Sequence, residues 1–328
     1  ALAGGPVRTL IIAPRFTLRD AAELAERLDV QLDTFPLALD SLFAWPGWPA
    51  QPSPGTWSEG EAEERLLQQL KKPIDVLLLG RFDPDILPAS VQTSLLRKVQ
   101  QGTGLVCAHL VSAAPASAQP GPLRAFLQDL SWKADEKNIP AGVGEYLLST
   151  VASRTVVETA VAGQGRVVRF MYPGDPPKTH CLIAAPLDPM NAFSAYLDNA
   201  FSLVARAVRW TAKREPVTRI AGIADLTPQG PIQEEIPPGY PPEFVAQMRD
   251  SAMRQPTRPY LISLNQPADR DYRVAVQLRR PDAITQLAYT CKTPLAKGMA
   301  TYAVDLLAGP GEYLLDIWLQ DKHGIVDW

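Results

Sequence analysis

The sequence is poor in cysteine and histidine, with three of each in 328 residues. Three cysteines do not make a disulfide framework, and none of them lies in a CxxC pattern. A disulfide-stapled fold and a cysteine zinc site are therefore not expected. We expect no bound metal and no cofactor, because no HExxH or HxH spacing is present and the glycine-rich nucleotide-binding motifs are missing.

Long hydrophobic runs and a strong charge of one sign are also missing. No run approaches the roughly 18 apolar residues that a membrane-spanning helix needs, so no membrane span is expected. The formal net charge is −3, which argues against a nucleic-acid partner bound by bulk charge. Proline is in excess: its 32 residues in a chain of 328 are close to twice the ordinary share of about 5%.

The first two thirds of the chain alternate between short apolar runs and amphipathic stretches. The apolar runs predict strands at 7–13, 33–39, 74–79 and 104–108, and the amphipathic stretches predict helices at 19–28, 58–70 and 90–101. Two further strands are expected at 154–162 and 166–171, joined by a glycine turn, followed by a long helix at 191–213. This order predicts an α/β domain over residues 1–215, with a flavodoxin-like parallel sheet and helices on both of its faces.

The last third has a different pattern. Residues 216–259 are crowded with proline, which predicts a linker or a surface wrap. From residue 260 the hydrophobic period changes to two, with strand candidates at 260–264, 272–278, 284–290, 301–306 and 311–319. Short strands at this spacing predict a small all-β sandwich domain over residues 260–328.

Three stretches of the first domain resemble a known group of proteins. They are the helix end and strand RKVQQGTGLVCAH at 97–109, the strand GQGRVV at 163–168 and the helix FSLVARAVRW at 201–210. In this order they are similar to the ThuA-like group of the class I glutamine amidotransferase-like superfamily, and to the trimerisation domain of some β-galactosidases. The C-terminal third resembles an immunoglobulin- or fibronectin-like accessory module. The resemblance implies a link to carbohydrate metabolism, and a dimer or trimer formed through the α/β domain.

In working members of that superfamily, a nucleophilic cysteine sits at a sharp turn from strand to helix, where backbone N–H groups face the developing oxyanion. In this chain the resemblance puts His109 at that turn. Cys107 falls two residues earlier, which withdraws its side chain by about 7 Å along the strand. We therefore interpret Cys107 as a buried apolar side chain and not as a nucleophile.

Two histidines are the candidate catalytic residues. His109 follows a central strand, where open α/β sheets build their sites, and it can act as a general base, as a metal ligand or as a hydrogen-bond partner of a substrate, or it can cap the strand end. His180 lies in a region where the resembled group carries a Gly-His pair, although Thr179 replaces the glycine. If the two side chains converge, they form a two-histidine site.

Other polar and aromatic residues are candidate ligand-binding groups. Arg15 follows the first predicted strand, and Arg81 and Asp83 follow the third, so all three are expected at the same edge of the sheet. Trp45 and Trp48 lie in a proline-rich loop, where they can stack on a sugar ring or anchor the loop.

Two hypotheses for function follow. The first is a non-catalytic, degenerate amidotransferase-like module that binds a carbohydrate or another small polar ligand, or that serves assembly. The second is an enzyme that uses His109 and His180 on a sugar or a related polar substrate.

Overall fold

The computed structural model of the chain describes 12 stretches of residues, between Gly5 and Asp327. These stretches are 5–14, 18–37, 59–108, 110, 119–134, 157–171, 182, 194–214, 216–225, 257–280, 283–307 and 313–327. The chain divides into two compact units, Ala1–Glu215 and Pro216–Trp328, and each is described by itself. No helix in these stretches is both long enough and apolar enough to cross a membrane.

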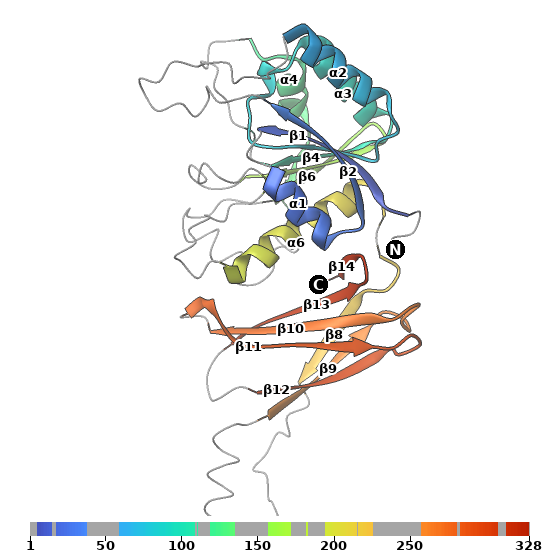
Figure 1. The fold of residues 1–328 in the computed structure, drawn as a ribbon, viewed down its shortest axis with the longest axis vertical. Helices are drawn as coiled ribbons and strands as arrows, with labels where there is room; N and C mark the ends of the chain where they lie inside the picture. The colour runs from blue at the N-terminus through green and yellow to red at the C-terminus, as the bar shows by residue number, and fades with distance from the viewer. Residues whose placement is uncertain are drawn as a thin grey trace, which may run out of the picture. The chain divides into compact units, whose positions relative to one another are not determined.

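The first unit alternates strands and helices along the chain (Figure 1). Its elements are β1 (Val7–Pro14), α1 (Leu18–Arg27), β2 (Val30–Leu37), α2 (Glu59–Lys71), β3 (Val76–Leu79), the short 3₁₀ helix η2 (Pro84–Ile86), α3 (Ala89–Gln100), β4 (Gly104–Ala108), α4 (Pro122–Asp129), β5 (Lys133–Ala134), β6 (Val157–Ala162), β7 (Gly165–Phe170) and α6 (Ser194–Thr211).

The seven strands form one mixed sheet in the order β2-β1-β3-β4-β7-β6-β5. The pairs from β2 to β7 are parallel, whereas β6 pairs antiparallel with both β7 and β5. The parallel sheet expected from the sequence is thus present in five strands, and the hairpin of β6 and β7 adds an antiparallel part to it. The cause is the short turn at Gly163, where φ is +59°, because two strands joined by so tight a turn must run in opposite directions.

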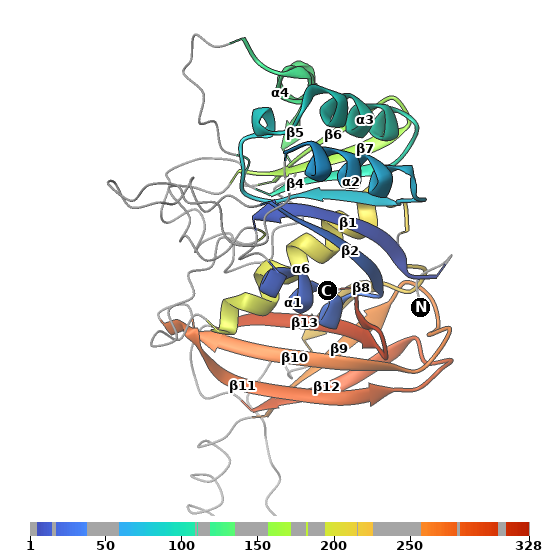
Figure 2. The ribbon, with the colours of Figure 1, turned by 45° about the horizontal axis from the view of Figure 1, so that its top comes forward.

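Helices cover both faces of this sheet, as the alternation predicts (Figure 2). Helices α2, α3 and α4 lie on one face, and α1 and α6 lie on the other. The strands between them are buried on both sides: all four residues of β3 and all five of β4 are buried. Burial on both faces explains why these strands are continuous apolar runs in the sequence.

Gly104, in the stretch with the family resemblance, is required by close packing. A Cβ atom at Gly104 would lie 2.6 Å from the Cβ of Thr211 in α6, and 2.7 Å from the carbonyl carbon of the same residue. The absence of a side chain at Gly104 thus lets α6 pack directly on the start of β4.

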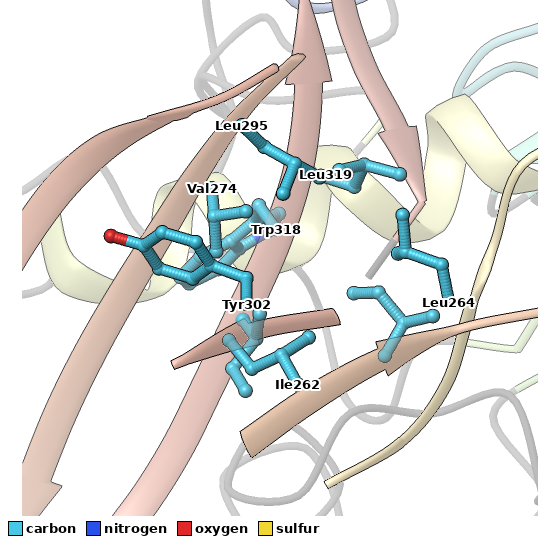
Figure 3. Close-up of a pocket in the computed structure, with 9 residues that line it drawn as sticks. Ile262, Leu264, Val274, Leu295, Tyr302, Trp318 and Leu319 are labelled. Carbon is cyan, nitrogen blue, oxygen red and sulfur yellow. The ribbon is translucent and has the colours of Figure 1, made fainter. Parts of the chain in front are cut away.

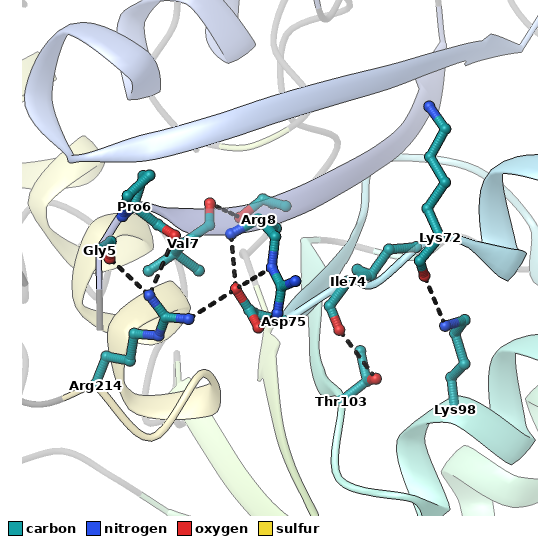
Figure 4. A network of polar contacts seen from close by, with 11 residues as sticks. Gly5, Pro6, Val7, Arg8, Lys72, Ile74, Asp75, Lys98, Thr103 and Arg214 are labelled. Carbon is teal, nitrogen blue, oxygen red and sulfur yellow. Dashed lines mark hydrogen bonds and ion pairs between the residues drawn. The ribbon is translucent and has the colours of Figure 1, made fainter. Parts of the chain in front are cut away.

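A polar network ties together the amino ends of the strands (Figure 4). The carboxylate of Asp75 accepts hydrogen bonds from the backbone N of Arg8 at 2.9 Å, from its Nε at 3.0 Å and from its Nη2 at 2.6 Å. Arg214, just after α6, donates to the same carboxylate at 3.0 Å and to the carbonyl of Gly5 at 2.6 Å. The network therefore joins β1, the start of β3 and the end of α6.

The second unit is a β-sandwich. Its strands are β8 (Ile220–Asp225), β9 (Thr257–Leu264), β10 (Tyr272–Arg280), β11 (Ala283–Leu295), β12 (Thr301–Leu307), β13 (Leu314–Asp321) and β14 (Gly324–Asp327). They form a four-stranded sheet, β11-β10-β13-β14, and a three-stranded sheet, β12-β9-β8. Ile262 and Leu306 from one sheet share an apolar core with Val276 and Leu319 from the other.

Strand β8 corrects the expected extent of the linker. It lies inside residues 216–259, yet it pairs antiparallel with β9 from Asp225–Tyr260 to Ile220–Leu264. The prolines that suggested a linker begin at Pro228, after β8 has ended. The first part of the expected linker thus belongs to the sandwich, and the rest, from 226 to 256, lies outside the described residues.

Candidate functional site

The carboxyl ends of five parallel strands meet at one edge of the large sheet, where open α/β sheets bind ligands. Of the residues expected there, Arg81 and Asp83 are described. Arg15, Trp45, Trp48, His109 and His180 lie outside the described residues, so the proposed two-histidine pair stays a prediction. Both Arg81 and Asp83 are buried, 5% and 2% exposed.

Asp83 has a structural role. Its carboxylate caps η2 by accepting a hydrogen bond from the backbone N of Asp85 at 3.0 Å. The same oxygen accepts a short hydrogen bond from Nη2 of Arg124 in α4. Because the described contacts already engage this carboxylate inside the protein, they give Asp83 an anchoring role at the exit of β3.

The residues around Asp83 hold the start of α4 in place. Asp85 pairs with Arg124 at 3.0 Å and accepts the backbone N–H of Gly121 at 3.1 Å. Gln92 of α3 accepts the N–H of Leu123 at 2.9 Å, and its own amide donates to the carbonyl of Leu87 at 2.7 Å. These contacts satisfy N–H groups of the first turn of α4, which lack partners within the helix.

Cys107 is sealed in the core. It lies in β4, paired with Leu79 of β3 and Arg169 of β7, and its residue is 2% exposed. Burial raises the pKa of the Cys107 thiol to about 12, although the charge of Arg169 acts in the opposite direction. A thiol that stays protonated and has no access to solvent cannot serve as a nucleophile at neutral pH.

Asp20 links two distant parts of the chain at this same edge. It lies in the first turn of α1, is fully buried, and accepts a hydrogen bond from the backbone N of Leu182 at 3.0 Å. The contact therefore holds Leu182 beside the start of α1, and the residues on either side of Leu182, His180 among them, lie outside the described residues. Since β3 alone separates β1 from β4, the ends of β1 and β4 are about 10 Å apart.

A surface hollow of about 290 Å³ lies between β2 and α2. Its lining residues are Phe35, Glu64, Arg65, Gln68 and Gln69. The side-chain oxygen of Gln69 is buried and accepts no hydrogen bond from any described residue. This atom has no surface that a ligand can reach, whereas the exposed side chains of Arg65 and Gln68 offer the hollow hydrogen-bonding groups that suit a small polar ligand. The segment that joins β2 to α2 is the one that contains Trp45 and Trp48.

A second space lies inside the sandwich, between the two sheets (Figure 3). Apolar side chains line it, including Ile262, Leu264, Val274 and Leu319. It leaves no room for a molecule the size of water. We interpret it as a packing gap of the core and not as a ligand site.

Within the described stretches, no group of three or more histidine, cysteine or acidic residues is placed to hold a metal ion. No protein-family model, curated protein or solved structure matches the chain.

Proposed function

We propose that the chain is a non-catalytic, amidotransferase-like binding or assembly module with a flavodoxin-like α/β domain and an accessory β-sandwich. The order β2-β1-β3-β4-β7 of the five parallel strands supports the flavodoxin-like assignment, because it is the 2-1-3-4-5 order of such sheets. The antiparallel hairpin of β6 and β7, with β5 beside it, extends that plan.

The burial of Cys107 is the observation that carries the non-catalytic part. A glutaminase of this superfamily needs an exposed thiolate at the strand end, whereas Cys107 lies inside the strand with its pKa raised to about 12. For Cys107 to act as a nucleophile, its thiol would have to move out of the interior of the sheet to the end of β4.

The hollow beside α2 is the proposed ligand site. A carbohydrate, or another small polar molecule, would hydrogen-bond to the exposed Arg65 and Gln68. Trp45 and Trp48, which the sequence offers as stacking faces for a sugar or as anchors of their loop, lie outside the described residues. This assignment agrees with the link to carbohydrate metabolism that the resemblance implies.

Two measurements test the proposal together. Incubation with glutamine should release no ammonia above that of buffer, and release that disappears in Cys107→Ala would overturn the non-catalytic assignment. Ligand-observed NMR with a panel of mono- and disaccharides should detect at least one binder. Gln68→Ala should weaken its binding, whereas the matched control Gln100→Ala, on exposed α3 surface, should not. Equal losses in both variants would refute the proposed hollow.

A second candidate function is an enzyme that uses His109 and His180 on a sugar. The contact between Asp20 and Leu182 supports it, because Leu182, two residues after His180 in the sequence, lies at the edge where open α/β sheets bind ligands. In this case a sugar from the same panel should be consumed, and His109→Gln or His180→Gln should abolish the turnover. His323→Gln, in the second unit, is the control and should have no effect.

A further inference from the structure

The opposite edge of the large sheet, where the parallel strands begin, gathers positive charge. Helices α2, α3 and α6 end there, and hydrogen bonds link their ends. The amine of Lys98 donates to the carbonyl of Lys72 at 3.0 Å, and the amine of Lys213 donates to the carbonyl of Gln164 at 2.6 Å. The backbone N of Gln164 in turn donates to the carbonyl of Gln100 at 3.0 Å. These contacts make one continuous surface, which we call the amino edge.

The Asp75 network belongs to the same surface (Figure 4). The backbone N of Asp75 donates to the carbonyl of Arg8 at 2.8 Å, and the backbone N of Thr103 donates to that of Lys98 at 3.0 Å. Arg214 reaches Asp75 from the end of α6. The cations of β1, α2, α3 and α6 are thus neighbours along a single edge.

Cations outnumber carboxylates on the amino edge. Among the described residues, the cations are Arg8, Arg27, Lys71, Lys72, Arg97, Lys98, Arg166, Lys213 and Arg214, and the carboxylates are Glu26, Asp29, Asp33 and Asp75. Asp75 forms ion pairs with Arg8 and Arg214, and Asp33 forms an exposed ion pair with Lys72 at 3.1 Å. The whole chain has a net charge of −3, so this edge has the opposite sign to the protein that carries it.

Four of these cations have no carboxylate partner among the described residues. Lys98 and Lys213 donate to neutral carbonyl groups, and Lys71 and Arg97 are exposed. The dipole of each helix explains why a basic residue stabilises its C-terminal end. The helix dipole does not explain why so few carboxylates lie beside these basic residues. Ion pairs on a protein surface place few demands on their surroundings, so carboxylates could have been placed there.

We propose that the amino edge binds an acidic peptide segment of another protein. The carboxylates of such a segment would pair with Lys71, Arg97, Lys98 and Lys213. The net negative charge of the chain would repel a long polyanion such as a nucleic acid, whereas a short acidic segment needs only local complementarity. This inference concerns a different edge from the proposed ligand site and stands independently of it.

The test compares two variants with the same change in net charge. Lys71→Glu with Arg97→Glu reverses two exposed cations of the amino edge, and Lys133→Glu with Lys292→Glu reverses two exposed cations elsewhere. Fluorescence anisotropy with a labelled oligo-glutamate peptide at low salt should show about tenfold weaker binding for the edge variant. The control variant should bind as the wild type does, and added salt should weaken all binding.

Three results would overturn the proposal. The first is no binding of oligo-glutamate by the wild type at low salt. The second is an equal loss in the edge and control variants, which would indicate an effect of bulk charge. The third is tighter binding of a single-stranded oligonucleotide with the same number of charges, which would indicate a nucleic-acid surface. Circular dichroism of each variant establishes that the fold persists.

Discussion

Replacing Asp75 with asparagine should destabilise the α/β unit substantially. The side chain of Asp75 is 15% exposed and pairs with Arg8 and Arg214, which lie near the two ends of this unit's sequence. Asparagine has nearly the same shape but no charge, and its amide hydrogens would face a guanidinium group. The side chain of Arg8 is 43% exposed, so solvent weakens its ion pair with Asp75. The side chain of Arg214 is 16% exposed, so its ion pair with Asp75 is screened less. We expect a loss of about 2–4 kcal/mol in the free energy of unfolding.

Hydrogen exchange can measure this loss of unfolding free energy in the α/β unit alone. The chain has two compact units, so a single unfolding transition is not assured, and peptides from β1 and β3 report on the first unit alone. Their slowest amides should exchange roughly 30-fold to 700-fold faster in Asp75→Asn, since every 1.4 kcal/mol is a factor of ten. Asp33→Asn is the matched control, because it breaks the exposed pair with Lys72 and should cost less than about 0.5 kcal/mol.

The effect should also depend on pH. Burial raises the pKa of the Asp75 carboxyl, but the hydrogen bonds from Arg8 and the charges of Arg214 and Arg8 outweigh it, so the pKa is lowered overall. A carboxyl whose pKa is lower in the folded state stabilises the fold above its unfolded pKa of about 3.9 and loses this effect as the pH falls through the folded value. The gap between wild type and Asp75→Asn should be full at pH 7 and should narrow below about pH 4. A gap no larger than that of Asp33→Asn at pH 7 would refute the reasoning.

Three further predictions concern packing and burial. Gly104→Ala should lower the stability to urea by about 1–3 kcal/mol, because its Cβ would lie 2.6 Å from the Cβ of Thr211; an unchanged midpoint would contradict this packing. Cys107 should resist a thiol reagent in the native protein and react after denaturation, as mass spectrometry of its peptide would show; native labelling would disprove its burial. Tyr272→Phe should destabilise the sandwich by about 1–2 kcal/mol, since the hydroxyl of this buried residue donates to Asp269; an unchanged Tm of the sandwich would argue against that bond.

The elements that the sequence predicts well are those whose pattern is local. Strands β3 and β4 are continuous apolar runs because both faces are buried, and the structure places them within one or two residues of the expected bounds. The hairpin of β6 and β7 is likewise local, because its glycine turn marks the place where the chain reverses direction. Strand β8 was missed because its six residues adjoin a proline-rich stretch whose composition dominated the interpretation.

The candidate site was harder to predict, because its contacts join residues far apart in the sequence. Asp83 was expected to bind a ligand from its position after a strand, yet it bonds to Arg124, 41 residues later. Nothing in the sequence around Asp75 points to Arg214, 139 residues away. A polar residue at a strand end can face a ligand or an internal partner, and the choice depends on where a distant helix packs.

One variant of the amino edge should change the affinity for an acidic peptide while leaving the stability of the fold nearly unchanged. Asp33→Asn removes a carboxylate from the amino edge and frees Lys72 while leaving the fold nearly as stable, since both side chains are more than half exposed. If the edge binds acidic segments, this variant should bind oligo-glutamate about twofold more tightly than the wild type. Asp305→Asn makes the same charge change on the exposed surface of β12 and should leave the affinity unchanged. A rise in affinity shared by both variants would mean that net charge governs the binding, and the amino edge would then hold its cations only to stabilise the helix ends.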